Sequence, residues 1–145
     1  MKVFNKRAKF DYELTPEKLE AGIVLKGIEA KSFRDGRANL SQSYAKIMSG
    51  EMFLINANIP VENANKYDSS RIRKLLLHKN EILAIETKMK QKKLQIVPIS
   101  MYNNGRRIKI ELVLGKSKKE FQKKDSIKRK DIERDIEREF RSKDY

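Results

Sequence analysis

The chain has 145 residues, of which 39% are hydrophobic and 37% charged, and its formal net charge is +14. This length and apolar content favour one compact domain with an appendage, while the charge predicts a polyanionic partner, nucleic acid before an anionic membrane surface. The sequence has no cysteine for disulfides or metal sites and no apolar run of membrane-helix length, so we expect a cytoplasmic protein without a membrane partner.

The first half of the chain predicts a strand, a short helix and a hairpin, in that order. Residues 21–29 (AGIVLKGIE) are apolar enough for a first strand. A short helix is expected over residues 30–35, because Gly36 can adopt the left-handed conformation that ends a helix. Apolar runs on both sides of the Ser-Gly pair at 49–50 predict a hairpin over residues 43–59, with this pair as its turn.

A longer helix is predicted within residues 73–93. Ile82, Ile85 and Met89 share one face at helical spacing, and Asn80 is a candidate N-cap. Lysines gather toward the C-terminal end of this stretch, where the helix dipole favours cations.

A second hairpin is predicted over residues 94–114. The Asn-Gly pair at 104–105 is typical of a turn in which both residues have positive φ. In this register Met101 lies opposite Ile108, and one face of the hairpin is fully apolar. Pro98 has no backbone donor, so it is expected at an edge or a bulge.

Together these elements predict a mainly β fold. We expect a small OB-like barrel of five or more strands, with a short helix after the first strand and a helix between the third and fourth strands. A five-stranded sheet beside a helix, without closure, is the alternative. The barrel is assigned to residues 1–115 and a basic C-terminal tail to residues 116–145.

The tail has its own composition. Between positions 116 and 131, eight Lys and Arg residues stand against three acidic residues. This part should be disordered in the free protein, because it buries too little apolar surface to offset its ordering entropy. Ile132, Ile136 and Phe140 follow at four-residue spacing and predict a helix that packs against a surface, either of a partner or of the barrel.

Residues suited to catalysis or metal binding are sparse. His78 is the only histidine, and the sequence has neither a Walker motif nor a GxGxxG motif. Glu29 and Asp35 are the nearest pair of acids for a metal-dependent nuclease, and two acids are a weak signal. We therefore expect no enzyme activity, no metal site and no cofactor.

Aromatic residues alternate with basic ones near the N-terminus. Phe4, Phe10 and Tyr12 could stack on exposed bases, which is how single-stranded and looped RNA is usually bound. Alternatively, Phe10 and Tyr12 cover one end of the barrel. The neighbouring lysines and arginine would supply phosphate contacts in either case.

Three stretches carry a resemblance that spans nearly the whole chain. They are NKRAKFDYEL at 5–14, EAGIVLKGIEAKSFRDGRANLSQSYAKI at 20–47 and RKLLLHK at 73–79. Their order and spacing resemble the SsrA-binding protein family, also called small protein B. The basic segment at 111–131 (ELVLGKSKKEFQKKDSIKRKD) is similar to the tail of that family.

The resemblance implies a function in bacterial ribosome rescue. Members of the family bind the tRNA-like part of transfer-messenger RNA (tmRNA) and bring it into the empty A site of a stalled ribosome. Translation then switches to the reading frame of the RNA, and the nascent chain receives a degradation tag. The resemblance thus implies a monomeric adaptor of trans-translation, with tmRNA and the ribosome as partners. The tail would fold in the decoding centre and the vacant mRNA channel.

The resemblance also assigns residues to each RNA partner. For tmRNA the matching positions are Asn5, Arg7, Glu29, Lys31, Ser32, Arg34, Asn39, Lys74 and Leu75. For the ribosome the tail supplies Lys116, Lys118, Lys119, Phe121, Lys123, Lys124, Ile127, Lys128 and Arg129. The lysines would neutralise rRNA phosphates, Phe121 would stack on bases, and Ile127 would pack a helix onto rRNA.

Two rival hypotheses remain open. One is a ribosomal-protein-like barrel that holds rRNA permanently, and the other is the metal-dependent nuclease. The role of Glu29 is also open. In an RNA site its carboxylate can accept hydrogen bonds from base amino groups or a 2′-hydroxyl, or it can orient a neighbouring Lys or Arg, and outside such a site it is a buried structural residue.

Overall fold

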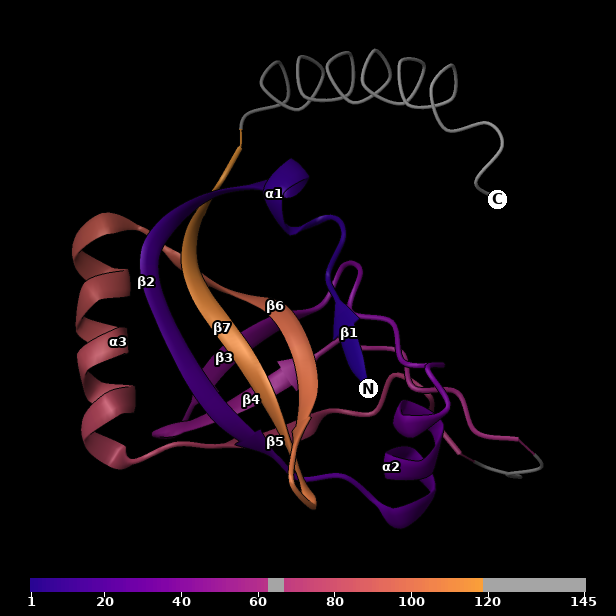
Figure 1. Cartoon of the computed structure of the whole chain (residues 1–145). Helices are drawn as coiled ribbons and strands as arrows, with labels where there is room; N and C mark the ends of the chain where they lie inside the picture. The colour runs from indigo at the N-terminus through magenta and orange to yellow at the C-terminus, as the bar shows by residue number, and fades with distance from the viewer. Residues whose placement is uncertain (63–66, 119–145) are drawn as a thin grey trace, which may run out of the picture.

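The computed structural model describes residues 1–62 and 67–118, which form a β-barrel flanked by helices (Figure 1). Its elements are β1 (Lys2–Phe4), α1 (Ala8–Asp11), β2 (Tyr12–Ile23), α2 (Gly27–Arg34), β3 (Tyr44–Met48), β4 (Glu51–Ile55), β5 (Arg73–Leu76), α3 (Lys79–Lys92), β6 (Gln95–Asn104) and β7 (Arg107–Ser117). The longer strands, β2, β6 and β7, run side by side along the barrel in Figure 1.

Strand pairing closes the sheet into a barrel. The antiparallel order is β1-β6-β3-β4-β5-β2-β7, and β6 also pairs with β7. The ring therefore passes through β6, β3, β4, β5, β2 and β7, and it closes through the pair Ala45–Ile96. β1 pairs with the part of β6 that lies beyond β3. The prediction of an OB-like barrel with five or more strands is confirmed, and the open sheet is excluded.

The interior of the ring is the hydrophobic core. Among its fully buried side chains are Met52, Leu54, Leu75, Ile96, Ile110, Leu112 and Leu114. The helix α3 covers one side of the barrel (Figure 1), with Ile82 and Ile85 buried and Met89 packed against the core. The predicted apolar face of this helix is thus confirmed.

The strand predicted over residues 21–29 is wrong in its position. β2 begins at Tyr12 and ends at Ile23, and α2 already begins at Gly27. Glu29 explains the early start of the helix, because its carboxylate accepts a hydrogen bond from the N–H of Lys26 at 2.8 Å and so satisfies a free donor of the first turn. After α2 the chain turns at Gly36 with a φ of +78°, as predicted.

The RKLLLHK stretch is divided between a strand and a helix. Its first four residues form β5, in which Arg73 and Leu75 point inward and alternate with the exposed Lys74 and Leu76. The N-cap of α3 is His78 and not Asn80. β1 and β5 were both absent from the sequence prediction, because strands of 3 and 4 residues give little periodic signal.

The two hairpins differ in how well the sequence predicts them. The first turn is Ser49-Gly50, with φ of +53° and +75°, as expected. In the second hairpin Met101 pairs with Ile110, so the predicted register is wrong by two positions. The turn consists of Gly105 and Arg106, and of these only Gly105 has positive φ, as in a type II′ turn. A shift of two keeps the apolar face inward, which is why the alternation alone could not detect it.

Pro98 lies where the sequence placed it. The pairing of β6 with β7 shifts between Pro98 and Ser100, which marks a bulge. The missing N–H of proline removes no regular ladder bond at such a site.

Candidate nucleic-acid interface

A cavity with a cationic rim opens between α2 and the β6–β7 turn. Its volume is about 580 Å³, which lies within the usual range for ligand pockets, roughly 300–1,000 Å³. We call it the basic pocket. Its lining is Gly22, Ile23, Leu25, Ala30, Arg34, Leu76, Arg106, Arg107, Ile108 and Lys109. Four cations thus surround a mostly aliphatic floor.

The charges of the basic pocket are not neutralised by neighbouring acids. Within residues 1–62 and 67–118 no carboxylate forms an ion pair with Arg34, Arg106, Arg107 or Lys109. Clustered cations without counter-charges create a positive potential that attracts anions such as phosphate. The pocket therefore suits a phosphate-bearing ligand whose apolar part lies on the floor.

The floor depends on Gly22 and Leu76, which pair across β2 and β5. A Cβ on Gly22 would lie 3.3 Å from the Cβ of Leu76, so the glycine lets the leucine lie close to the sheet. Leu76 is 53% exposed, which is unusual for a leucine in a barrel strand. Sequence reasoning selected Leu75, which is buried, and missed its exposed neighbour.

Glu29, on α2, has no exposed surface and does not line the basic pocket. Its carboxylate accepts hydrogen bonds from Tyr67 at 2.8 Å, from Arg71 at 2.5 Å and from the Nε of Arg73 at 2.8 Å, in addition to the N–H of Lys26. Arg73 is also fully buried, and its two Nη groups reach backbone carbonyls and Tyr67. Burial raises the pKa of Glu29, but the hydrogen bonds from Arg71, Lys26, Tyr67 and Arg73 outweigh it and lower the pKa to about 2.

This network joins two of the elements that line the basic pocket, α2 and β5. Glu29 belongs to α2, which also carries Ala30 and Arg34, while Arg73 belongs to β5, which also carries Leu76. The ion pair between Glu29 and Arg73, at 2.7 Å, therefore fixes α2 against β5. Of the two roles that the sequence left open for Glu29, its geometry matches the buried structural one.

The residues that the resemblance assigned to tmRNA fall into an exposed group and a buried group. Arg7, Lys31, Arg34, Asn39 and Lys74 are exposed, and only Arg34 of these lines the basic pocket.

The other assigned residues are buried, namely Asn5, Glu29, Ser32 and Leu75. Asn5, for example, donates a hydrogen bond from Nδ2 to the carbonyl of Pro98 at 2.8 Å. Burial limits how far these side chains can reach a ligand, although Ser32 also lines a small cavity beside α2. Arg106, Arg107 and Lys109 were missed, although their position beside the predicted turn was a usable signal.

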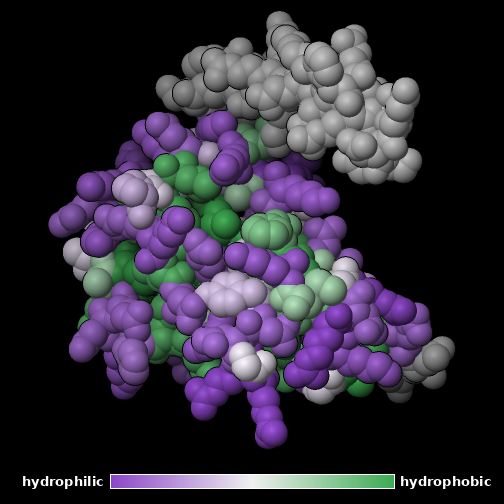
Figure 2. Space-filling model, viewed as in Figure 1, coloured by the Kyte–Doolittle hydropathy of each residue, from purple (hydrophilic) through white to green (hydrophobic). Residues whose placement is uncertain are grey.

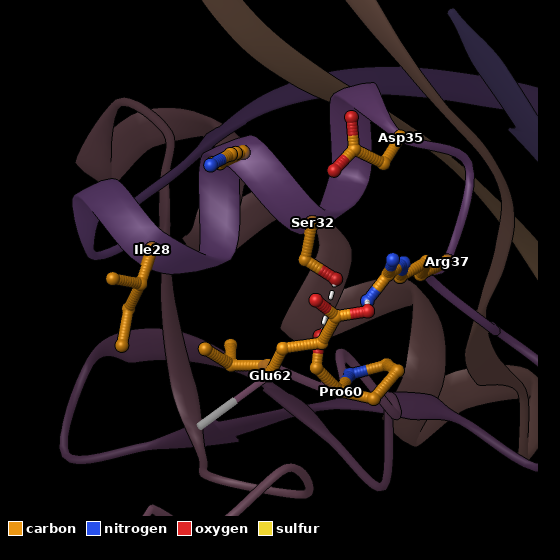
Figure 3. A pocket seen from close by; sticks show the side chains of 8 residues that line it. Ile28, Ser32, Asp35, Arg37, Pro60 and Glu62 are labelled. Carbon is orange, nitrogen blue, oxygen red and sulfur yellow. Dashed lines mark hydrogen bonds and ion pairs between the residues drawn. The ribbon is translucent and has the colours of Figure 1, made fainter. Parts of the chain in front are cut away.

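A smaller cavity of about 150 Å³ lies on another side of α2 (Figure 3). In Figure 3 the Ser32 side chain points to the carbonyl of Pro60, to which its hydroxyl donates a hydrogen bond. Arg37 forms an ion pair with Glu62 at 2.5 Å. Lys31 and Asp35 also line this cavity, so its charges balance and it has no preference for anions.

The aromatic side chains near the N-terminus differ in their exposure to solvent. Phe10 is 9% exposed, and the guanidinium of Arg7 lies 5.0 Å from the centre of its ring. Of the pair expected to cover one end of the barrel, Phe10 is thus buried, whereas Tyr12 is only half-buried. Phe4, in contrast, is 58% exposed on β1.

Two of the predicted tail residues belong to the described structure. Lys116 lies in β7 and pairs with Glu13 of β2. Lys118 donates from Nζ to the carbonyl of Lys9 at 2.8 Å and from its N–H to the carbonyl of Asp11 at 3.1 Å. The others lie outside the described residues, namely Lys119, Phe121, Lys123, Lys124, Ile127, Lys128 and Arg129, and so do Ile132, Ile136 and Phe140.

Within the part of the chain that the structure describes, no group of three or more His, Cys, Asp or Glu side chains is placed to hold a metal ion. Glu29, which the nuclease hypothesis required, already has both oxygens bound to arginines. No helix among the same residues has the length and hydropathy needed to cross a membrane.

A closed barrel with an unneutralised cationic pocket, in a chain of net charge +14, defines a nucleic-acid-binding barrel protein. The comparisons with known proteins narrow this class. The family model described as SmpB protein matches residues 2–142, and the chain belongs to this family.

Similar proteins span nearly the same length. The SsrA-binding protein of Sulfurihydrogenibium sp. (strain YO3AOP1) is 46% identical over 142 residues, covering 96% of this chain and 93% of its own. That of Bacillus subtilis (strain 168) is 46% identical over 140 residues, covering 94% and 89%. A solved structure described as "tmRNA-SmpB: a journey to the center of the bacterial ribosome" matches with a TM-score of 0.66 and 41% identity, covering 82% of this chain and 85% of that one.

Proposed function

We propose that this protein is an RNA-binding adaptor that binds tmRNA and delivers it to stalled ribosomes for trans-translation. The observation that carries this function is the basic pocket, with four unneutralised cations over an apolar floor, in a member of the SmpB family. Both partners, tmRNA and the ribosome, are present in the description of the similar solved structure. The adaptor performs no catalysis itself and acts as a monomer in the bacterial cytoplasm, where ribosomes are.

The basic pocket is the proposed grip on tmRNA. Its cations contact phosphates, which position an RNA without reading its sequence. The aliphatic floor, with the exposed Leu76, receives the apolar face of a ribose or an unstacked base. Arg34 contributes directly, while Glu29 and Leu75 contribute by holding α2 and β5 in place.

The other exposed residues of the resemblance remain part of the proposal. Arg7, Lys31, Asn39 and Lys74 extend the RNA surface beyond the pocket. Lys74 is already paired with Glu51 at 3.1 Å, so an RNA phosphate would have to compete with that carboxylate.

Charge reversal in the pocket tests this proposal. The double variant Arg107→Glu/Lys109→Glu should weaken binding to tmRNA by about a hundredfold or more, because it adds repulsion to the loss of two phosphate contacts. The matched control is Lys90→Glu/Lys92→Glu on α3, away from the pocket (Figure 1), which should bind within about threefold of the wild type. Equal weakening in both double variants would mean a general cationic attraction and would contradict a specific site.

The tail is proposed to act on the ribosome and not on tmRNA. Its lysines and Phe121 would contact rRNA in the decoding centre and the vacant mRNA channel, so ordering entropy is lost only where mRNA is absent. A chain ending at Lys118 keeps the pairs of β7 with β2 and both bonds of Lys118. It should bind tmRNA like the full chain but fail to support alanine transfer on ribosomes stalled with truncated mRNA.

The full chain and the chain ending at Lys118 also distinguish the adaptor from the rival hypothesis of a barrel that binds rRNA permanently. A permanent rRNA-binding barrel would copurify with all ribosomes and would not prefer tmRNA over ordinary tRNA. The proposed adaptor prefers tmRNA, and its tail is required only for the ribosomal step.

A further inference from the structure

Phe4 combines high exposure with a neighbouring cation and a second aromatic ring. Its side chain is 58% exposed on β1. The Nζ of Lys2 lies 5.0 Å from the centre of the Phe4 ring and 5.6 Å from the centre of the Tyr102 ring. We call this group of Lys2, Phe4 and Tyr102 the aromatic platform. The family resemblance assigned none of its residues to tmRNA or the ribosome, and the sequence offered Phe4 only as one of three aromatics that could stack on bases.

The strand register joins the platform to the basic pocket. Lys2 pairs with Tyr102, Tyr102 with Lys109, Lys109 with Gly22, and Gly22 with Leu76. Side chains directly opposite each other point to the same face of a sheet, so this row crosses five strands on the outer face of the barrel. Its last three members line the pocket, and its first two belong to the platform. The two features therefore form one continuous surface.

The platform is held in place before any ligand binds. The hydroxyl of Tyr102 donates a hydrogen bond to the carboxylate of Glu20. Burial and this bond raise the pKa of Tyr102 to about 12, so the phenol stays a donor at physiological pH. At the end of β1, the N–H of Asn5 donates to the carbonyl of Ile99 at 2.7 Å. A fixed strand loses little entropy on binding, which favours affinity.

Figure 2 shows pale and green side chains around β1 and β6 among purple hydrophilic ones. Phe4 pairs with the buried Ser100, so part of its ring covers the barrel. The remaining exposed ring has the ammonium of Lys2 beside it, and Lys2 begins the row that leads to the basic pocket. Nucleobases stack on aromatic rings, and their phosphates seek nearby cations. This chemistry favours RNA over an apolar partner.

We propose that the platform binds an unstacked base of the RNA whose phosphates occupy the basic pocket. The base stacks on Phe4, and the adjoining phosphates lie between Lys2 and Lys109. This inference rests on the proposed function, since it extends the same RNA surface across the β1–β6 edge.

A single-tryptophan variant reports the stacking directly, because the sequence has no tryptophan. Phe4→Trp should bind tmRNA at least as tightly as the wild type, and its fluorescence should be strongly quenched at saturation. The matched control is Leu83→Trp, whose parent side chain is 61% exposed on α3, and its fluorescence should change little. Both proteins are full-length chains titrated with tmRNA.

Affinity supplies the second measurement. Phe4→Ala should weaken tmRNA binding by roughly 5- to 150-fold, which corresponds to the stacking of one base. Its salt dependence should equal that of the wild type, because no charge is lost. Leu83→Ala, which removes an equally exposed apolar side chain, should bind within about twofold of the wild type. Far-ultraviolet circular dichroism and thermal unfolding verify that both variants fold.

Any of three results would overturn the inference. If wild type binds tmRNA tightly while Phe4→Ala binds within twofold of it and Phe4→Trp is not quenched, the platform does not contact this RNA and the proposed function stands alone. If Phe4→Ala loses only association with ribosomes, the platform faces a ribosomal component. If wild type itself shows no preference for tmRNA over tRNA, the proposed function and the inference fail together.

Discussion

Glu29 and Arg73 form an ion pair without solvent contact, and such pairs have two opposed effects on stability. Removing both charges from water is costly, so the pair itself adds little net stability. Removing only one partner leaves the other charge buried and uncompensated. Here Arg73 would keep its bonds to backbone carbonyls but would lose its only buried anionic partner among the described residues.

The substitution Glu29→Gln should therefore destabilise the protein by about 3–5 kcal/mol. Guanidinium denaturation at neutral pH measures this difference. The control is Glu51→Gln, which breaks the exposed ion pair with Lys74 and should cost about 0–1 kcal/mol. A loss below 1 kcal/mol for Glu29→Gln would mean that Arg73 finds water or another partner.

The same carboxyl predicts how stability depends on pH. Its folded pKa of about 2 lies below the usual glutamate pKa of 4.5, so the unfolded state binds the proton first on acidification. The stabilisation is fully present above about pH 4.5 and is lost as the pH falls toward 2. The free energy of unfolding should fall across this window more steeply for the wild type than for Glu29→Gln. If the free energy of unfolding depends on pH in the same way for both proteins, the low pKa of Glu29 in the folded state is contradicted.

At the scale of elements, the β6–β7 turn decides where the cations of the basic pocket lie. Gly105 has a φ of +63°, and Arg106 and Arg107 follow it directly. A side chain at this φ costs roughly 1–2 kcal/mol. Gly105→Ala should therefore lower stability by about that amount and also weaken tmRNA binding, because the turn can relax only by moving the arginines.

The control for this turn is Gly27→Ala at the start of α2. Gly27 has no atom within 4 Å of a Cβ and no positive φ, so alanine there should be neutral or slightly stabilising. Both effects are measured by denaturation and by tmRNA titration. Unchanged affinity in a destabilised Gly105→Ala protein would show that the arginines do not need the turn geometry.

Sequence patterns predicted the elements that have strong local signals. Both hairpins have a Gly in the turn and α3 has a regular apolar face, so these elements were found, although the second turn is Gly105-Arg106 and not Asn104-Gly105. The short strands β1 and β5 depend on long-range pairing with β6, β2 and β4, which no local pattern records. The predicted register of the second hairpin was wrong because a shift of two positions keeps the same face inward, so the apolar alternation fits both registers.

The candidate site was predicted less well than the fold. The basic pocket is assembled from α2, β2, β5 and the β6–β7 turn, and its parts are distant in sequence. Matching motifs identified Arg34 within it, but they cannot separate buried from exposed members of a motif. Leu75 and Leu76 illustrate this, because a strand of unknown register does not show which leucine faces outward.

At the scale of the whole molecule, charge and its distribution determine how RNA binding responds to salt. The net charge of +14 gives a non-specific attraction, whereas the basic pocket and the platform give a local one. Counterion release makes the logarithm of the affinity fall linearly with the logarithm of the salt concentration, in proportion to the phosphates neutralised. The slope of this line therefore reports the number of phosphate contacts, which a single affinity value cannot give.

The double variant Arg106→Gln/Arg107→Gln should reduce the magnitude of this slope by roughly 1.4–1.8, because each lost phosphate contact removes about 0.7–0.9. Titrations of tmRNA between low and physiological salt measure it. Lys90→Gln/Lys92→Gln removes the same charge from α3 and should leave the slope within experimental error. If both variants change the slope equally, the RNA responds to total charge. If only the pocket variant does, the cations of the β6–β7 turn contact phosphate in the complex.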